Sequence, residues 1–296
     1  MSSLMKFFSL TYEVSWTCFA AGGALTLRGA PSGSPLAAVA GLLLLLGTIA
    51  PSLVALWLTR QTAGSAGTSA LFDRVFAWRV RARWYVFALS YMATIKLSVA
   101  VVYRVITGAW PLFGQEPWYL LVAAVPVSTV VQAGEEIGWR GYALPRLATR
   151  LGFGGGSVLL GLLWSTWHLP LFFIPGIDKH GQSFPLYVIQ AVALSVAMAW
   201  LYVHTNGSLL LTMLMHSAVN QSLGIVSSVV ATATNPFAIS PSFVAWLTAG
   251  LMWIAAGYFL IRMPAARELR SGKHVSSEPP HEIIAEAAAI RDAPRR

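Results

Sequence analysis

Charged residues are scarce in this sequence, and their scarcity limits the kind of protein it encodes. Only 10% of the 296 residues are Asp, Glu, Lys or Arg, whereas soluble domains contain about 25%. Hydrophobic residues make up 56% of the chain, and the mean hydropathy is +0.64. This composition excludes an ordinary soluble enzyme and predicts an integral membrane protein.

Cysteine and acidic residues are also few. The single cysteine, Cys18, lies in an apolar stretch, so no intramolecular disulfide can form, and we interpret it as a packing residue. The 11 Asp and Glu against 20 Lys and Arg give a net charge of +9. Nucleic-acid binding would need the cations to gather on one soluble domain, but they lie between apolar runs. We therefore expect membrane lipid as a partner and no nucleic acid.

Long apolar runs predict an all-α, polytopic transmembrane bundle over residues 1–262. The clearest run, 36–58, has no charge and is long enough to cross about 30 Å of hydrocarbon. Glu13 interrupts the first run and argues against a cleaved signal peptide. The polar, basic segment 263–296 is expected to be a mostly disordered cytoplasmic tail. The eight expected spans are 7–27, 36–58, 84–103, 118–142, 153–174, 184–203, 206–231 and 241–261.

The distribution of basic residues predicts the orientation of this bundle. With eight spans and the N-terminus inside, sixteen of the 20 Lys and Arg lie on the cytoplasmic side, as the positive-inside rule requires. Only Arg28, Arg104 and Lys179 lie outside. We therefore expect both termini in the cytoplasm of a bacterial-type cell. The basic, aromatic segment 60–83 is expected to be a linker that leads into an interfacial amphipathic helix on anionic lipid.

The stretch Glu135-Glu136-x-x-x-Arg140 places three charges at the end of an apolar run. Each costs about 2.5–3.5 kcal/mol at bilayer depth, so they must face a protein interior or a wet cavity. Glu136 and Arg140 are four residues apart and can form an ion pair on one helix face. Glu135 lies about 100° round the helix and is free to act as a general base. Alternatively, all three form a structural charge network.

Two further spans carry polar pairs at helical spacing. Trp164 and His168 share one face of the expected fifth span, and His216 and Asn220 share one face of the seventh. Each histidine alone is typical of an interhelical hydrogen bond. The expected fourth, fifth and seventh spans each supply polar groups, whereas the second, sixth and eighth have no charge. This distribution favours one common site within the core segment 118–231. From the expected helix ends, this site opens toward the cytoplasm.

These residues form three motifs in a fixed order: Glu135-Glu136-x-x-x-Arg140, Trp164-x-x-x-His168 and His216-x-x-x-Asn220. Together they resemble the C-a-a-X protease and bacteriocin-processing family of intramembrane endopeptidases, of the Ras-converting type. The resemblance covers about 118–231. The family's second motif usually begins with Phe, and Trp164 takes that place here.

The resemblance implies a role for each motif residue. Glu135 and His168 would activate a water, His216 and Asn220 would stabilise the oxyanion, and Glu136, Arg140 and Trp164 would support them. Such a carboxylate and imidazole suit water activation, and an amide suits an oxyanion site. The family is commonly called metalloprotease, and Glu135, His168 and His216 form a candidate zinc-ligand set with an open fourth position. The H-E-x-x-H helix of soluble zinc proteases is absent, so both a zinc-bound and a metal-free site stay open.

The sequence thus predicts an intramembrane endopeptidase that hydrolyses a peptide bond in a membrane-associated protein or peptide. The main alternative is a non-catalytic binding or immunity-type membrane protein that uses the polar cluster as a pocket. A further alternative is an ion- or proton-coupled transporter with Glu135 as carrier, although the paired broken helices of such folds are not found.

Overall fold

The computed structural model describes residues 2–29, 31, 33–227 and 235–263, and in these ranges the chain is helical without a β-strand. A π-helix, η1 (Ile137–Ala143), joins α4 to α5, and a short 3₁₀-helix, η2 (Leu169–Phe173), follows α5. The α-helices are α1 (Ser3–Leu27), α2 (Pro35–Val75), α3 (Ala82–Thr107), α4 (Trp118–Glu136), α5 (Leu144–Trp167), α6 (Phe184–His204), α7 (Leu209–Ser222) and α8 (Phe243–Arg262). The all-α fold that the sequence predicts is confirmed.

Within the described ranges, five helical segments are long and apolar enough to cross a membrane. They are 35–75, 82–107, 184–204, 243–262 and the continuous segment 118–173. The expected seventh span is shorter than predicted, because α7 has only 14 residues and its length of about 21 Å is less than the hydrocarbon thickness. The count of eight spans and the position of both termini stay predictions. The expected tail, apart from Met263, lies outside the described residues.

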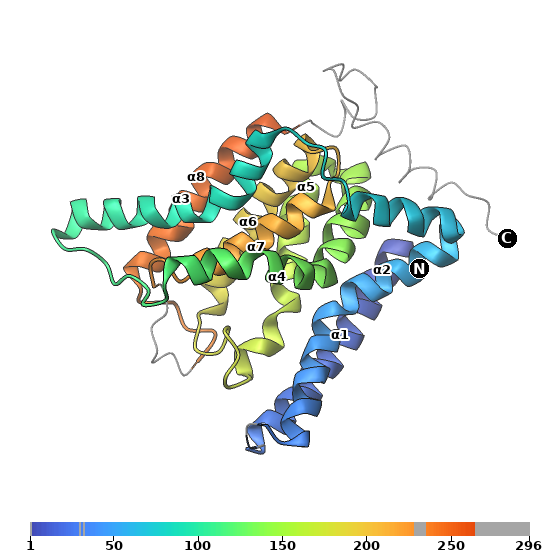
Figure 1. The fold of residues 1–296 in the computed structure, drawn as a ribbon, viewed down its shortest axis with the longest axis horizontal. Coiled ribbons are helices and arrows are strands. Elements are labelled where there is room, and N and C mark those ends of the chain that lie inside the picture. The colour runs from blue at the N-terminus through green and yellow to red at the C-terminus, as the bar shows by residue number, and fades with distance from the viewer. Residues whose placement is uncertain (1, 30, 32, 228–234, 264–296) are drawn as a thin grey trace.

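Helix α6 is largely buried and packs against α5, α7 and α8. Helices α1 and α2 form a hairpin that projects from the rest of the bundle, and α3 lies beside α8 (Figure 1). Small residues bring α5 and α6 close together. A Cβ added at Gly161 would lie 2.7 Å from the Cα of Val192, and the Ser195 hydroxyl donates to the carbonyl of Ser157 over 2.8 Å. Small residues of this kind are typical of helix contacts in membranes.

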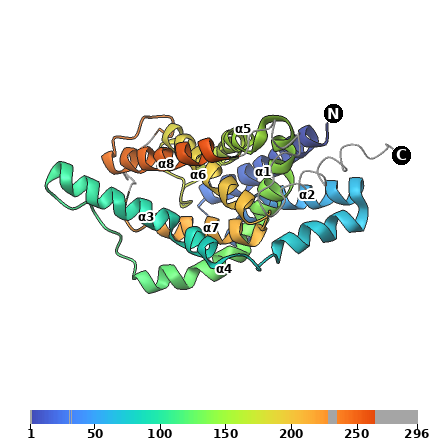
Figure 2. The ribbon, with the colours of Figure 1, turned by 90° about the horizontal axis from the view of Figure 1, so that it is seen from above.

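Helix α2 differs from the sequence prediction in its second half. The residues after Arg60 were expected to form a linker, but the helix continues to Val75. Gly64 has a φ of 66° and divides it into two parts, of which the second runs back toward α3 (Figure 2). Because glycine adopts a positive φ without the steric penalty of a side chain, the turn needs only this one residue. Binding of the 60–83 segment to lipid stays a prediction.

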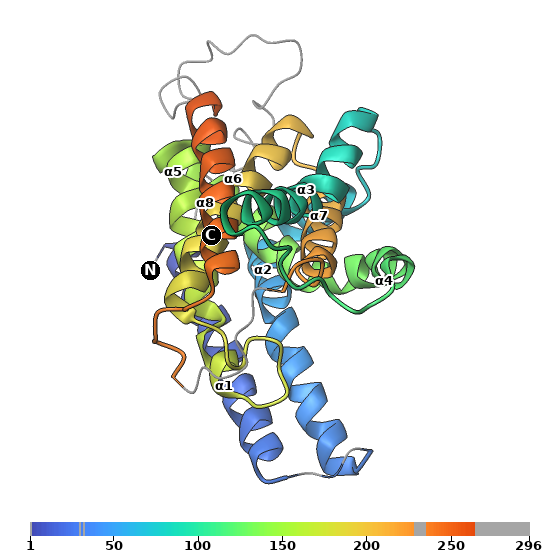
Figure 3. The same ribbon diagram turned by 90° about the vertical axis from the view of Figure 1, so that its left-hand side faces the viewer.

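The passage from α4 to α5 brings the charged motif against α2. Gly134 and Gly138 lie at this contact, and a Cβ on Gly138 would lie 2.6 Å from the carbonyl carbon of Pro51. The Ser52 hydroxyl donates to the carbonyl oxygen of Ala133 over 2.7 Å. The π-helix follows directly, and all seven of its residues are buried. Residues 143–152, which were expected to separate the fourth span from the fifth, are therefore helical. The helix bends there at Gly152, whose φ is 70°. Figure 3 shows α4 and α5 on opposite sides of the bundle.

Candidate active site

Glu136 is the centre of a fully buried charge cluster. Its Oε1 accepts a hydrogen bond from Nη1 of Arg140 over 2.8 Å, and neither side chain is exposed. Nδ1 of His216, on α7, lies 2.9 Å from the same oxygen. The ion pair that the four-residue spacing predicts is therefore present, and it includes a histidine that the sequence alone did not assign to it.

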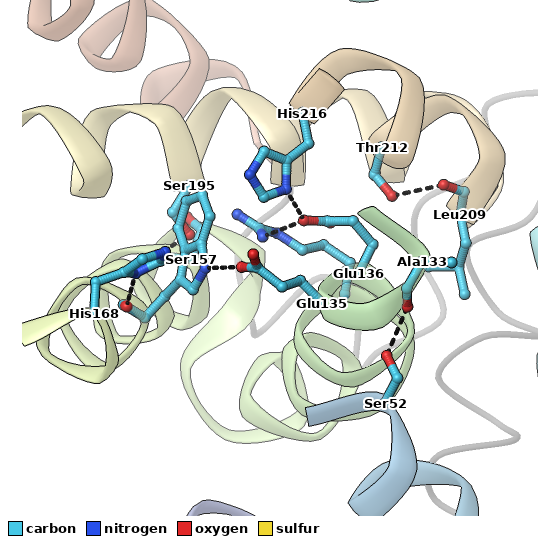
Figure 4. Close-up of polar contacts among 12 residues, drawn as sticks. Ser52, Ala133, Glu135, Glu136, Ser157, His168, Ser195, Leu209, Thr212 and His216 are labelled. Carbon is cyan, nitrogen blue, oxygen red and sulfur yellow. Dashed lines mark hydrogen bonds and ion pairs between the residues drawn. The ribbon is translucent and has the colours of Figure 1, made fainter. Parts of the chain in front are cut away.

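The Glu135 carboxylate is directed toward α5 (Figure 4). Nε1 of Trp164 donates to its Oε2 over 2.7 Å. The guanidinium carbon of Arg140 lies 4.3 Å from the centre of the Trp164 ring, a cation–π contact. Trp164 therefore lies between the two charged groups: its ring edge contacts one glutamate, and its face contacts the arginine that pairs with the other.

His168 is held at the C-terminal end of α5. Its Nδ1 lies 2.8 Å from the backbone carbonyl of Trp164. A carbonyl only accepts hydrogen bonds, so Nδ1 must carry the proton, and in the neutral ring Nε2 is left as an acceptor. The rings of Trp167 and Tyr187 pack against the imidazole at centroid distances of 4.6 and 5.4 Å. The unprotonated nitrogen is thus available to a water or a substrate.

A cavity of about 280 Å³ joins the three motifs. Glu135, His168, His216 and Asn220 all line it. The first three are 6%, 6% and 4% exposed, whereas Asn220 is exposed. The convergence of the fourth, fifth and seventh predicted spans on one site is therefore observed. Most of the other lining residues are apolar, as a cleft for a hydrophobic segment would need; they include Leu44, Met92, Val131, Leu194, Val219 and Met252.

The cavity lies toward one end of the bundle. Asp178 and Lys179, in the connection between η2 and α6, line it, whereas no residue of the basic segments 76–81 and 143–152 does. The η2–α6 connection and the α1–α2 turn lie at the lower side of Figure 1, and segment 76–81 lies at the upper side. The charge-based orientation places the η2–α6 connection outside the cell. That orientation and the cytoplasmic opening of the site both stay predictions.

The candidate zinc ligands do not form a metal-binding group in this geometry. Within the described ranges, no three His, Cys, Asp or Glu side chains come together as metal ligands do. Glu135, His168 and His216 are therefore not grouped as the candidate three-ligand zinc set requires, and we derive no step through a metal.

Sequence reasoning missed several polar residues that line the cavity, among them Gln132, Tyr187 and Lys179. Gln132 lies one turn before Glu136 on α4, so helical spacing could have identified it. Lys179 comes from the η2–α6 connection, and Tyr187 comes from the start of α6. Their spacing in the sequence does not indicate a site, because their position beside His168 depends on the path of an irregular loop.

The segment that carries this site is similar to known proteins. Residues 117–222 match the family described as "Type II CAAX prenyl endopeptidase Rce1-like". The "CAAX prenyl protease 2" of Methanococcus maripaludis is 30% identical to this chain over 95 residues, which cover 29% of the chain and 34% of that relative. The match thus spans about a third of the relative's length. The resemblance to the C-a-a-X protease and bacteriocin-processing family that the three motifs indicate is confirmed for the segment that carries them.

Proposed function

We propose that the protein is an intramembrane endopeptidase that hydrolyses a peptide bond of a membrane-associated protein or peptide. One observation carries the proposal: a buried carboxylate, an imidazole acceptor and a second histidine line one largely apolar cavity. The name of the relative points to prenylated C-terminal segments as substrates, and the apolar walls suit such a segment.

In this proposal Glu135 and His168 activate the attacking water. The water donates its hydrogens to the free carboxylate oxygen of Glu135 and to Nε2 of His168. As its oxygen attacks the carbonyl carbon, Glu135 takes one proton, which then passes to the leaving amine as the C–N bond breaks. Water is split between the two products: a hydroxyl joins the new carboxyl terminus and a hydrogen joins the new amino terminus.

His216 and Asn220 provide the oxyanion site. Nδ1 of His216 donates to Glu136, so donation from Nε2 to the oxyanion requires the ring to carry both protons. The side-chain amide of Asn220 is a second donor that lines the same cavity. Removing one such donor slows acyl transfer by about 10²–10³-fold in a well-studied protease.

Glu136 and Arg140 act as positioning residues. Glu136 binds His216 through the oxygen that also binds Arg140, and Arg140 packs on Trp164, which holds Glu135. The pair is therefore linked both to the proposed base, Glu135, and to the proposed oxyanion donor, His216, although it does not line the cavity. Its loss should displace the base and the oxyanion donor together.

Comparative proteomics of cells tests this function and identifies substrates. A strain with Glu135→Ala is compared with the parent and with a strain carrying Glu13→Ala, since Glu13 is an exposed glutamate on α1. We expect an uncleaved membrane peptide to accumulate only with Glu135→Ala. The shape-preserving Glu135→Gln should have the same effect. If the Glu135→Gln strain behaves as the parent, the alternative function holds: a non-catalytic membrane protein that uses the polar cluster as a binding pocket.

A further inference from the structure

Helix α1 lies outside the segment 117–222 that matches the known family, yet one of its faces contacts the end of α5 and the residues that follow it. Four residues of this face recur at intervals of four, three and four, as residues on one side of a helix do: Tyr12, Trp16, Phe19 and Gly23. A Cβ added at Gly23 would lie 2.8 Å from Cγ1 of Ile174. This face of α1 is therefore packed closely against the part of the chain that carries the second motif.

Two polar groups of this face bind the backbone at the end of α5. The Tyr12 hydroxyl donates to the carbonyl oxygen of Leu163 and lies 2.6 Å from Oγ1 of Thr166. Nε1 of Trp16 donates to the carbonyl oxygen of Trp167 over 3.1 Å. The last four carbonyls of an α-helix have no partner within the helix, and α5 ends at Trp167. Trp16 therefore supplies a hydrogen bond that α5 itself does not provide.

The aromatic packing of α1 reaches the imidazole of His168. The ring of Phe19 lies against that of Trp167 at a centroid distance of 5.4 Å, and the Trp167 ring lies 4.6 Å from the imidazole. Phe19 and Trp167 are both fully buried. Because buried side chains are closely packed and have little room to move, α1 restricts the imidazole through Trp167.

The two bound carbonyls lie next to the two site residues of α5. Leu163 directly precedes Trp164 in the chain, and Trp167 directly precedes His168. The carbonyl of Trp164 accepts the hydrogen of Nδ1 and fixes the tautomer of the imidazole. A 3₁₀-helix begins at Leu169, so the α-helix does not continue beyond this turn to stabilise it. Among the described residues that line the cavity, none comes from α1, so α1 acts on the site only through its neighbours.

From these contacts we propose that α1 is a positioning element of the active site. Tyr12 and Trp16 hold the last turn of α5 in the geometry in which His168 presents an unprotonated Nε2 to the water. The inference rests on the proposed function and adds two positioning residues to it, neither of which touches the substrate.

Conservative changes test this role. Tyr12→Phe and Trp16→Phe keep an aromatic ring and remove the hydroxyl and the indole N–H that bind α5. Tyr85→Phe and Trp246→Phe are the matched controls. They remove the same two groups where these bind backbone carbonyls over 2.7 and 2.9 Å, and neither residue lines the cavity. Each pair is also combined in a double variant.

The tautomer of His168 is the direct readout, measured at neutral pH by ¹⁵N NMR of histidine-labelled protein in detergent. Protonated and unprotonated ring nitrogens have well-separated shifts, and His168→Gln identifies the signals. The wild type and the double control should show the Nδ1–H tautomer alone, whereas Tyr12→Phe/Trp16→Phe should show both tautomers. An unchanged tautomer in that variant, or the same mixture in the double control, would overturn the proposal. The single variants provide the same test if the double variant does not fold.

Kinetics measure the consequence for the reaction. The substrate is an S-farnesylated peptide that ends in Cys-Val-Ile-Ser, a C-a-a-X sequence. Each single change should lower kcat by about three- to tenfold and the double change by more, as the loss of ordinary hydrogen bonds implies. KM should change by less than about twofold, and a wild-type kcat in the double variant would overturn the proposal. If the wild type cleaves nothing, the proposed hydrolysis is contradicted, and the tautomer alone decides the role of α1.

Discussion

Trp164 contacts Glu135 through its side chain and His168 through its backbone. The indole nitrogen donates to the carboxylate over 2.7 Å, and the carbonyl of the same residue lies 2.8 Å from Nδ1 of His168. One residue thus fixes both the orientation of the proposed base and the tautomer of its partner. The two groups proposed to bind water are held by a single helical position.

Trp164→Phe tests the side-chain half of this relationship. Phenylalanine keeps an aromatic ring against Arg140 and leaves the backbone carbonyl in place, but it cannot donate to Glu135. A hydrogen bond to a charged group contributes about 1.5–3 kcal/mol, so kcat should fall by about tenfold or more with little change in KM. Steady-state kinetics on the purified variant measures both. Unchanged kcat would show that Glu135 needs no donor at this position.

Removal of one partner from the buried pair Glu136–Arg140 should destabilise the protein strongly. Arg140→Met leaves Glu136 charged and buried, which costs about 3–5 kcal/mol in comparable cases. We expect a large drop in Tm in detergent, measured by thermal unfolding. Arg28→Met removes an exposed arginine and should change Tm little. The double variant Glu136→Met/Arg140→Met should be more stable than Arg140→Met alone, and a lower Tm would contradict the pairing.

Two glycines provide a matched test of the contact between η1 and α2. A Cβ at Gly138 would lie 2.6 Å from the backbone of Pro51, whereas a Cβ at Gly41 on α2 would meet nothing within 4 Å. Gly138→Ala should destabilise the protein by about 1–3 kcal/mol through overpacking. Gly41→Ala should be neutral or stabilising by up to about 1 kcal/mol. Denaturation in detergent measures both, and similar effects would contradict the close approach.

Cysteine labelling determines which side of the membrane the cavity faces. Asp178→Cys is placed in a Cys18→Ala background and treated with a membrane-impermeant maleimide. Because sixteen of the 20 basic residues lie on the opposite side in the predicted topology, the charge rule predicts labelling in intact cells. Labelling only after permeabilisation would reverse the orientation and open the site to the cytoplasm. Cys18→Ala alone is the background control.

The sequence predicted the local parts of this structure well. The helical class follows from apolar runs of spanning length, and the Glu136–Arg140 pair follows from four-residue spacing on one helix. Both depend on residues close together in the chain. The convergence of three helices on one cavity was also predicted, because an isolated charge in an apolar span needs a partner or water.

Other features depend on tertiary contacts that the sequence pattern does not contain. His216 contacts Glu136 rather than Glu135 because of the rotation of α7 against α4. The π-helix 137–143 widens the turn after the two glutamates, and nothing in its sequence distinguishes it from an α-helix. The bend at Gly64 and the continuation of α2 to Val75 likewise depend on how this helix packs. The approach of Lys179 to His168 depends on a loop.

Hydrolysis in isotopically labelled water tests the central claim most directly. The purified protein in detergent is incubated in ¹⁸O-water with an S-farnesylated peptide that ends in Cys-Val-Ile-Ser, a C-a-a-X sequence, with a free carboxylate. Mass spectrometry then measures the masses of the products. We predict a new carboxyl terminus that carries one ¹⁸O with the wild type and with Glu13→Ala, and no product with Glu135→Gln or His168→Ala. Full activity of Glu135→Gln, or a product without the label, would contradict a water activated by Glu135.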